Sequence, residues 1–179
     1  MKRVIVMVAT GMVLIVAGAA AKLITMENTG NSKELLLTST AFVNNGYIPA
    51  TYTCEGEGYN PGITIRNIPA GTESIAIIIE DPDAPKGVFD HWIAWNIAPV
   101  GSIAEHSAPG VQGLNGSGKS GYMGPCPPDD KPHRYFFKVY ALDVLLGLKA
   151  NSEKKDLQRE MQGHILAEGV LVGLYKKTR

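Results

Sequence analysis

Short apolar runs separated by Gly, Pro and Asn residues dominate the chain after residue 34. β-branched and aromatic residues are frequent in these runs, and turn residues bound them, which is the pattern of β-strands. The predicted strands lie at 35–38, 63–66, 74–79, 92–97, 134–142 and 170–175. The run at 74–79 is apolar at successive positions, so this strand is expected to be buried on both faces.

One helix is expected, over about 152–167, after the capping candidates Asn151 and Ser152. Its apolar positions recur at helical spacing: Leu157, Met161, His164 and Ile165. Strands in series followed by a late helix predict a mainly β protein built on an antiparallel sheet, rather than alternating βαβ units. Residues 98–131 are rich in Gly, Pro, Ser and Asn and lack periodicity, which predicts a long functional loop.

The N-terminus has a different pattern, in which the basic residues Lys2 and Arg3 precede an uncharged apolar run from Val4 to Ala21. This arrangement predicts a secretory signal peptide or a membrane anchor over 1–25, and both alternatives remain open. A linker over 26–34 and a folded domain over 35–179 follow. The charges before the run place the domain outside the cytoplasm, and membrane contact is expected only through this segment.

Composition narrows the classes of partner. The 179 residues suit one domain, and 17 Lys plus Arg balance 17 Asp plus Glu. Without an excess of positive charge, nucleic acid is not an expected partner. A hydrophobic content of 45% excludes disorder as the main theme.

Cys54 and Cys126 are the two cysteines of the chain. In an exported domain they are expected to form a disulfide, and a pair of buried thiols is the alternative. Neither cysteine has a second Cys or His at ligand spacing, so no metal site is expected.

Residues 113–120 (GLNGSGKS) match the phosphate-loop pattern G-x-x-x-x-G-K-[ST]. A working phosphate loop follows a buried strand and opens a helix, whereas here Gly- and Pro-rich segments flank the match on both sides. A nucleotide hydrolase is therefore the least favoured interpretation, and we expect a flexible glycine loop.

Residues suited to an anion pocket gather in four segments, at 81–85, 90–92, 121–128 and 132–135. They supply two histidines, a carboxylate, a phenol and Gly/Pro turns that hold backbone N–H groups in place. Such a set can surround a phosphate or carboxylate without a metal or other cofactor. No nucleophile accompanies them.

These segments and two others resemble the phosphatidylethanolamine-binding protein family, most closely its bacterial and archaeal Raf kinase inhibitor-like branch. The resemblance spans about 35–175, in family order. It rests on YTCEG at 52–56, DPDAP at 81–85, HW at 91–92, GYMGPCPP at 121–128, HRY at 133–135 and YALD at 140–143. It implies a large antiparallel sheet packed on a smaller one, one or two peripheral C-terminal helices, and an anion pocket at one end.

The resemblance also assigns residues to the pocket. Those expected to face the ligand are Asp81, His91, His133 and Tyr135, with the Gly124 and Pro125 backbone as a wall and Tyr122 at the rim. Asp83 and Arg134 are expected to brace the loops. The structural alternative for Asp81 is a turn-forming side chain, and for each histidine a satisfied core position.

The resulting hypothesis is a non-enzymatic, extracytoplasmic binding or regulatory protein whose ligand carries a phosphoryl or carboxylate group, as a phospholipid headgroup does. Protease inhibition or modulation of signalling, through a protein partner, is the expected biological role. The alternative is a phosphoester or acyl hydrolase that uses His91 or His133 as a general base.

Overall fold

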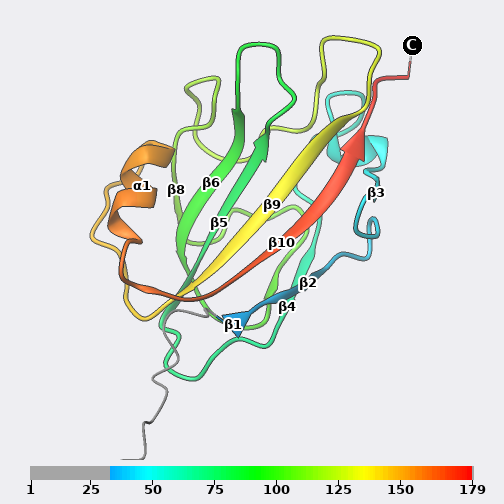
Figure 1. Ribbon diagram of the computed structural model, residues 1–179. Helices are drawn as coiled ribbons and strands as arrows, with labels where there is room; N and C mark the ends of the chain where they lie inside the picture. Colours follow the sequence, from blue (N-terminus) through cyan, green and yellow to red (C-terminus); the bar gives the residue numbers. More distant parts are fainter. Residues whose placement is uncertain (1–32, 179) are drawn as a thin grey trace, which may run out of the picture. The chain divides into compact units, whose positions relative to one another are not determined.

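The computed structural model describes residues 33–178, which form two β-sheets and one α-helix (Figure 1). The seven-stranded sheet has the order β1-β10-β9-β5-β6-β8, with β3 also pairing with β10, and the three-stranded sheet has the order β2-β4-β7. The large sheet contains β1 (Lys33–Glu34), β3 (Gly46–Tyr47), β5 (Ser74–Asp81), β6 (Phe89–Ile97), β8 (Val111–Gln112), β9 (His133–Leu142) and β10 (Ile165–Tyr175). The small sheet contains β2 (Leu36–Thr38), β4 (Ile63–Arg66) and β7 (Ser102–Ile103), and η1 (Ala50–Tyr52) is a single 3₁₀ turn.

This arrangement confirms the expected fold class, a large antiparallel sheet packed on a smaller one. Only the short edge strands β1 and β3 run parallel to their partner, β10. Side chains from both sheets form one core, which contains Ile77 of β5, Phe137 of β9 and Ile63 and Ile65 of β4. The strands alternate between faces, so the other face of the large sheet builds a second core.

β5 contributes to both cores, as its apolar run predicts. Ile75, Ile77 and Ile79 lie in the core between the sheets, whereas Ala76 and Ile78 lie in the second core. Leu157 of α1 (Lys154–Glu160) and Leu146 cover the second core. The sheet is therefore filled on both sides near its centre, and its polar residues collect at the strand ends.

The helix is shorter than the one expected over 152–167. A capping box between Glu153 and Asp156 starts it, and Gly163, at a φ of 82°, turns the chain after it. β10 begins at Ile165 and pairs with β9 through Tyr175, so the expected closing strand at 170–175 starts earlier. The apolar positions after Met161 fit either period, and the long partner strand β9 decides between them.

Other boundaries also differ from the expected ones. Lys33 and Glu34 of the expected linker pair with Ala167 and Glu168 as β1. The long loop predicted at 98–131 contains the short strands β7 and β8. The signal or anchor expected over 1–25 lies outside the described residues, and within 33–178 no helix is long and apolar enough to cross a membrane.

The segment that matches the phosphate-loop pattern is a hydrogen-bonded turn rather than a flexible loop. Leu114 and Ser120 form a β-bridge, and the buried Asn115 side chain accepts hydrogen bonds from the backbone N–H groups of Ser117 and Lys119. No helix follows Lys119 before residue 154 in the described chain. The segment thus lacks the helix N-terminus that would face a nucleotide's phosphates.

Cys54 and Cys126 are joined by the expected disulfide, which links the loop after η1 to the segment that leads into β9. The Cys54 N–H also donates to the Pro125 carbonyl oxygen at 3.1 Å. These two bonds hold together segments that are far apart in the sequence, at the end of the sheet where β9 begins.

Replacing both cysteines by serine is expected to lower the free energy of unfolding by about 4 kcal/mol, because the disulfide closes a loop with a sequence separation of 72 residues. Urea denaturation of the wild type and of the double variant measures this difference. The wild type under reducing conditions serves as the control and should match the variant. Equal midpoints for the oxidised wild type and the variant would contradict the prediction.

Candidate functional site

The antiparallel pairing of three strands brings the candidate residues to one end of the large sheet. β5 ends at Asp81, beside the beginning of β6, and β9 begins at His133. Because β5 runs antiparallel to both neighbours, its last residues lie next to their first ones. Figure 1 shows the β5–β6 turn and the segment entering β9 at the same end of the sheet.

A β-bulge turns His91 toward the site. Ile79 pairs with Trp92 and Glu80 pairs with Asp90, so His91 is an extra residue in β6. A bulge places two neighbouring side chains on one face, and here His91 joins Trp92 on the face toward the small sheet. The His91 ring meets the Tyr135 ring edge-on, with 5.1 Å between their centroids.

Strand alternation accounts for the other members of the set. Asp81 of β5 and His133 and Tyr135 of β9 follow the positions that face the core between the sheets. Arg134 lies on the opposite face of β9. The structure therefore brings together Asp81, His91, His133 and Tyr135, and all four are buried.

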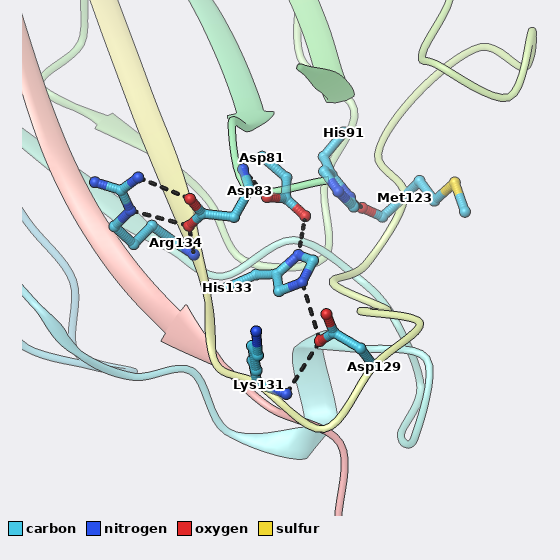
Figure 2. Close-up of polar contacts among 8 residues, drawn as sticks. All are labelled: Asp81, Asp83, His91, Met123, Asp129, Lys131, His133 and Arg134. Atoms are coloured by element: carbon cyan, nitrogen blue, oxygen red, sulfur yellow. Dashed lines mark hydrogen bonds and ion pairs between the residues drawn. The ribbon is translucent and has the colours of Figure 1, made fainter. Parts of the chain in front are cut away.

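Asp81 and His133 form the centre of a chain of polar contacts, drawn in Figure 2. Asp81 Oδ2 lies 2.8 Å from His133 Nδ1, and Asp81 Oδ1 accepts the backbone N–H of Asp83 at 2.8 Å. The second ring nitrogen, His133 Nε2, lies 3.3 Å from Asp129 Oδ1. Both ring nitrogens of His133 thus face carboxylates, and only an imidazolium ring can donate to both.

His91 has a different electrostatic environment. Its Nδ1 lies 2.7 Å from the Met123 carbonyl oxygen, an acceptor only, so this nitrogen carries a proton. Burial lowers the pKa of His91, and the hydrogen bond to Met123 and the nearby Asp81 oppose that shift in part. In the neutral ring the proton is on Nδ1, and Nε2 carries a lone pair that takes no part in the bond to Met123.

Tyr135 supplies a buried phenol beside these groups. Its hydroxyl meets no partner at hydrogen-bonding geometry within residues 33–178, although Asp81 and the Cys126 backbone lie close enough to affect its pKa. Burial, together with the charge of Asp81, raises the pKa of this phenol, so it stays protonated. An unpartnered buried hydroxyl is costly, and an added acceptor would reduce that cost.

Asp83 and Arg134 brace the turn from outside, as expected. Arg134 donates from Nη2 to Asp83 Oδ1 at 2.7 Å and from Nε to Asp83 Oδ2 at 2.9 Å, and its backbone N–H donates to the same Oδ2. The Arg134 hydrogen bonds lower the pKa of Asp83 to about 2. This fork ties the end of β5 to the beginning of β9.

A cavity of about 690 Å³ opens at this end of the sheet. Asp81 and His91 border it, as do Lys86, Met123 and Cys126. Most of the other lining residues are apolar and come from the β5–β6 turn and the Pro-rich segment: Ala84, Pro85, Val88, Phe89 and Pro128. His133, Tyr135 and Asp129 do not line it.

Three expected residues contribute differently from the expectation. The Tyr122 hydroxyl donates to the Tyr52 carbonyl oxygen at 2.9 Å, and Tyr122 borders a separate hollow instead of this rim. Gly124 packs against the backbone of residues 52–53, where an added Cβ would lie 2.8 Å from the Tyr52 oxygen. Met123 and Cys126, on either side of Gly124 and Pro125, line the cavity in their place.

Sequence reasoning missed Asp129 and residues 86–88 of the β5–β6 turn, whereas residues 84–85 belong to an expected segment. Asp129 stands four residues before His133 in a Pro-rich segment, and that spacing was the available signal. Nothing in the composition of residues 86–88 marks them as a cavity wall. No group of three or more His, Cys, Asp and Glu residues within 33–178 is arranged to hold a metal ion.

Comparison with known proteins assigns the chain and its fold to one family. The family described as Phosphatidylethanolamine-binding protein matches residues 38–176. A UPF0098 protein of Pyrococcus horikoshii is 46% identical over 158 residues, which cover 83% of this chain and 80% of that protein. A UPF0098 protein of Methanothermobacter thermautotrophicus is 43% identical over 149 residues, covering 79% of this chain and 98% of that protein.

Solved structures agree with the sequence comparison. The structure of a putative phosphatidylethanolamine-binding protein homologue from Chlamydia trachomatis has a TM-score of 0.78 and 42% identity, covering 82% of this chain and 100% of that one. E. coli YbcL, described as a member of the mammalian family, has a TM-score of 0.74 and 29% identity, covering 81% and 99%. The chain belongs to the phosphatidylethanolamine-binding protein family.

The Asp83–Arg134 pair predicts a loss of stability in acid. The folded pKa of Asp83, about 2, lies below its ordinary 3.8, so the contribution is present above 3.8 and disappears as the pH falls toward 2. Asp83→Asn is expected to cost about 1 kcal/mol near neutral pH, a modest value because the pair is partly exposed. Thermal unfolding from pH 7 to pH 2 measures both effects.

The control is Arg159→Gln, which removes the partner of Asp156 in a local pair on α1 and leaves the capping box of Asp156 in place. Its effect should be smaller, since residues three apart on a helix gain little from pairing. A gap between wild type and Asp83→Asn that persists unchanged at pH 2 would contradict the assignment.

Proposed function

We propose that the chain is an extracytoplasmic, non-enzymatic binding protein that takes a phosphoryl or carboxylate group into the cavity beside Asp81 and His91. The observation that supports it most is the free Nε2 of His91 at the cavity wall, with the unpartnered Tyr135 hydroxyl beside the ring. Once protonated, His91 Nε2 can donate one hydrogen bond to an oxygen in the cavity, whereas Tyr135 is buried behind the ring and does not line the cavity. The family relationship supports a binding role. The class of ligand is inferred from the chemistry of the residues at the cavity.

The presence of Asp81 in the cavity wall is compatible with an anionic ligand. Asp81 is 4% exposed, and its two oxygens already accept from Asp83 N–H and His133 Nδ1. A buried carboxylate held by donors is partly compensated, and the exposed Lys86 adds a positive charge at the rim. The apolar walls lower the local dielectric constant and thereby strengthen the hydrogen bonds made there.

Two features favour binding over hydrolysis. Nucleophilic catalysis by an Asp–His pair needs a hydroxyl or thiol at the second ring nitrogen, and His133 Nε2 faces Asp129 instead. Cys126, the thiol-type residue at the cavity, is bonded to Cys54. The disulfide also supports the extracytoplasmic part of the proposal, since such bonds persist in oxidising compartments. Inhibition of a protease stays a prediction.

Calorimetric titration of the purified protein with phosphate and with acetate tests the pocket. The wild type is expected to bind, and His91→Ala to bind about 10- to 100-fold more weakly, the loss of one hydrogen bond to a charged group. His164→Ala is the matched control, because His164 pairs with Asp143 on the surface and should leave affinity unchanged. Thermal unfolding of each variant verifies its fold.

Absence of anion binding by the wild type would overturn the proposal. A phosphoester panel separates the enzyme alternative: turnover by the wild type that disappears in both His91→Ala and His133→Ala would favour a hydrolase over a receptor.

The affinity is expected to depend on pH through His91. Sulfate is the suitable probe because its charge stays constant over the range, so only the protein titrates. With its pKa lowered by burial, His91 is neutral near pH 7 and must gain a proton before Nε2 can donate to sulfate. Binding should tighten as the pH falls from 8 to 5, by at most tenfold per pH unit.

His91→Ala should flatten this pH dependence, although Asp81, Asp90 and His133 contribute charge nearby and remain. Proton uptake, measured by titration in buffers of different ionisation enthalpy, gives an independent value. Sulfate affinity that rises with pH would show that the ring does not act as the donor.

A further inference from the structure

Asp129 occupies the outer side of His133. Its Oδ1 lies 3.3 Å from His133 Nε2, at the ring nitrogen that Asp81 leaves open (Figure 2). The side chain of His133 is 3% exposed, whereas that of Asp129 is 46% exposed. Asp129 therefore covers a buried donor with a carboxylate that itself stands largely in water.

The two carboxylates on His133 are held very differently. Asp81 is buried at the end of β5, and its second oxygen is fixed by the Asp83 N–H. Asp129 is bonded locally, to the Lys131 N–H at 3.0 Å and to His133, in an exposed segment between Pro128 and Pro132. Of the two, Asp129 is the one that a rotation of its own side chain can withdraw.

Neither Asp129 nor His133 lines the cavity, but residues next to both do. Asp81 and Pro128 border the cavity, but His133, which bonds to Asp81 and lies beyond Pro128 in the chain, does not. The Asp129 carboxylate stands where an oxygen of an external anion would meet His133 Nε2. Two anionic oxygens cannot share one N–H donor without strong repulsion, so occupation by one excludes the other.

We propose that Asp129 is a built-in carboxylate competitor, which an incoming phosphoryl or carboxylate ligand must displace from His133. The inference rests on the anion-binding function proposed above and adds the control of its affinity. Withdrawal of Asp129 frees His133 Nε2 and makes a second imidazole available to the ligand, in addition to that of His91. The apparent affinity is reduced by the fraction of molecules in which Asp129 covers the site.

Sulfate titration of Asp129→Ala and Asp129→Asn at 0.15 M salt tests the proposal. Asp129→Ala is expected to bind sulfate about 5- to 10-fold more tightly than the wild type, because it loses both the competitor and its repulsion. Asp129→Asn should be intermediate, since its amide oxygen still accepts from Nε2 without a full charge. The matched control is Asp130→Asn, which removes the same charge one residue away and should change affinity less than twofold.

A second variant separates competition at His133 from a general electrostatic effect. In a His133→Asn background, the Asp129→Ala change should no longer tighten sulfate binding, as the donor under contest is absent.

The outcomes separate the two proposals. If no variant and no wild type binds sulfate, the anion-binding function fails. If the wild type binds and Asp129→Ala binds equally or more weakly, the competitor proposal alone is overturned. A similar gain in Asp129→Ala and Asp130→Asn would also overturn it, because it would show a field effect without a contact at His133.

Discussion

The double-sided burial of β5 is the constraint on which the rest of the structure depends. This strand has apolar residues on both faces and antiparallel partners on both edges, so it can occupy only the middle of a layered sheet. Its polar end, Glu80 and Asp81, must then emerge beside the beginnings of β6 and β9. The convergence of Asp81 with the two histidines is therefore a consequence of packing at the centre of the sheet.

The two faces of the sheet carry different networks of charged residues at this end. Toward the small sheet, Asp81 and His133 are buried and share a bond. Toward α1, Glu80 binds Lys138 and Lys154, and Lys154 also binds Asp90. The second network is half-buried and fully paired, which suits a structural role of holding α1 on the sheet. The first network is the one that adjoins groups able to make further hydrogen bonds, among them His91.

The strands with enough residues to show a period could be predicted from sequence. β4 has the predicted bounds because its alternation is strict, and β5 and β9 extend their predicted runs by one or two polar residues. Strands of two residues, such as β3 and β7, carry no period and depend on tertiary pairing alone. The helix was overestimated because Ile165 and Ala167 satisfy both periods.

The site shows the same division. Asp81, His91 and His133 could be named from their motif, and strand alternation fixes where two of them point. The four-residue spacing of Asp129 and His133 was the one signal for their contact, and the contact itself depends on the path of an aperiodic Pro-rich segment. The cavity wall at 84–88 likewise depends on how a turn folds over the sheet end.

Because of the bulge, the face of the sheet on which His91 lies depends on the number of residues in β6. Removing one residue between Phe89 and His91 would restore regular pairing with β5 and turn the imidazole toward α1, while Trp92 and the core between the sheets stayed in place. Such a chain would keep the fold and the His91–Trp92 motif, but the His91 ring would no longer lie beside Tyr135. Members of this fold that carry the same histidine in an unbulged strand would therefore share the motif without the site.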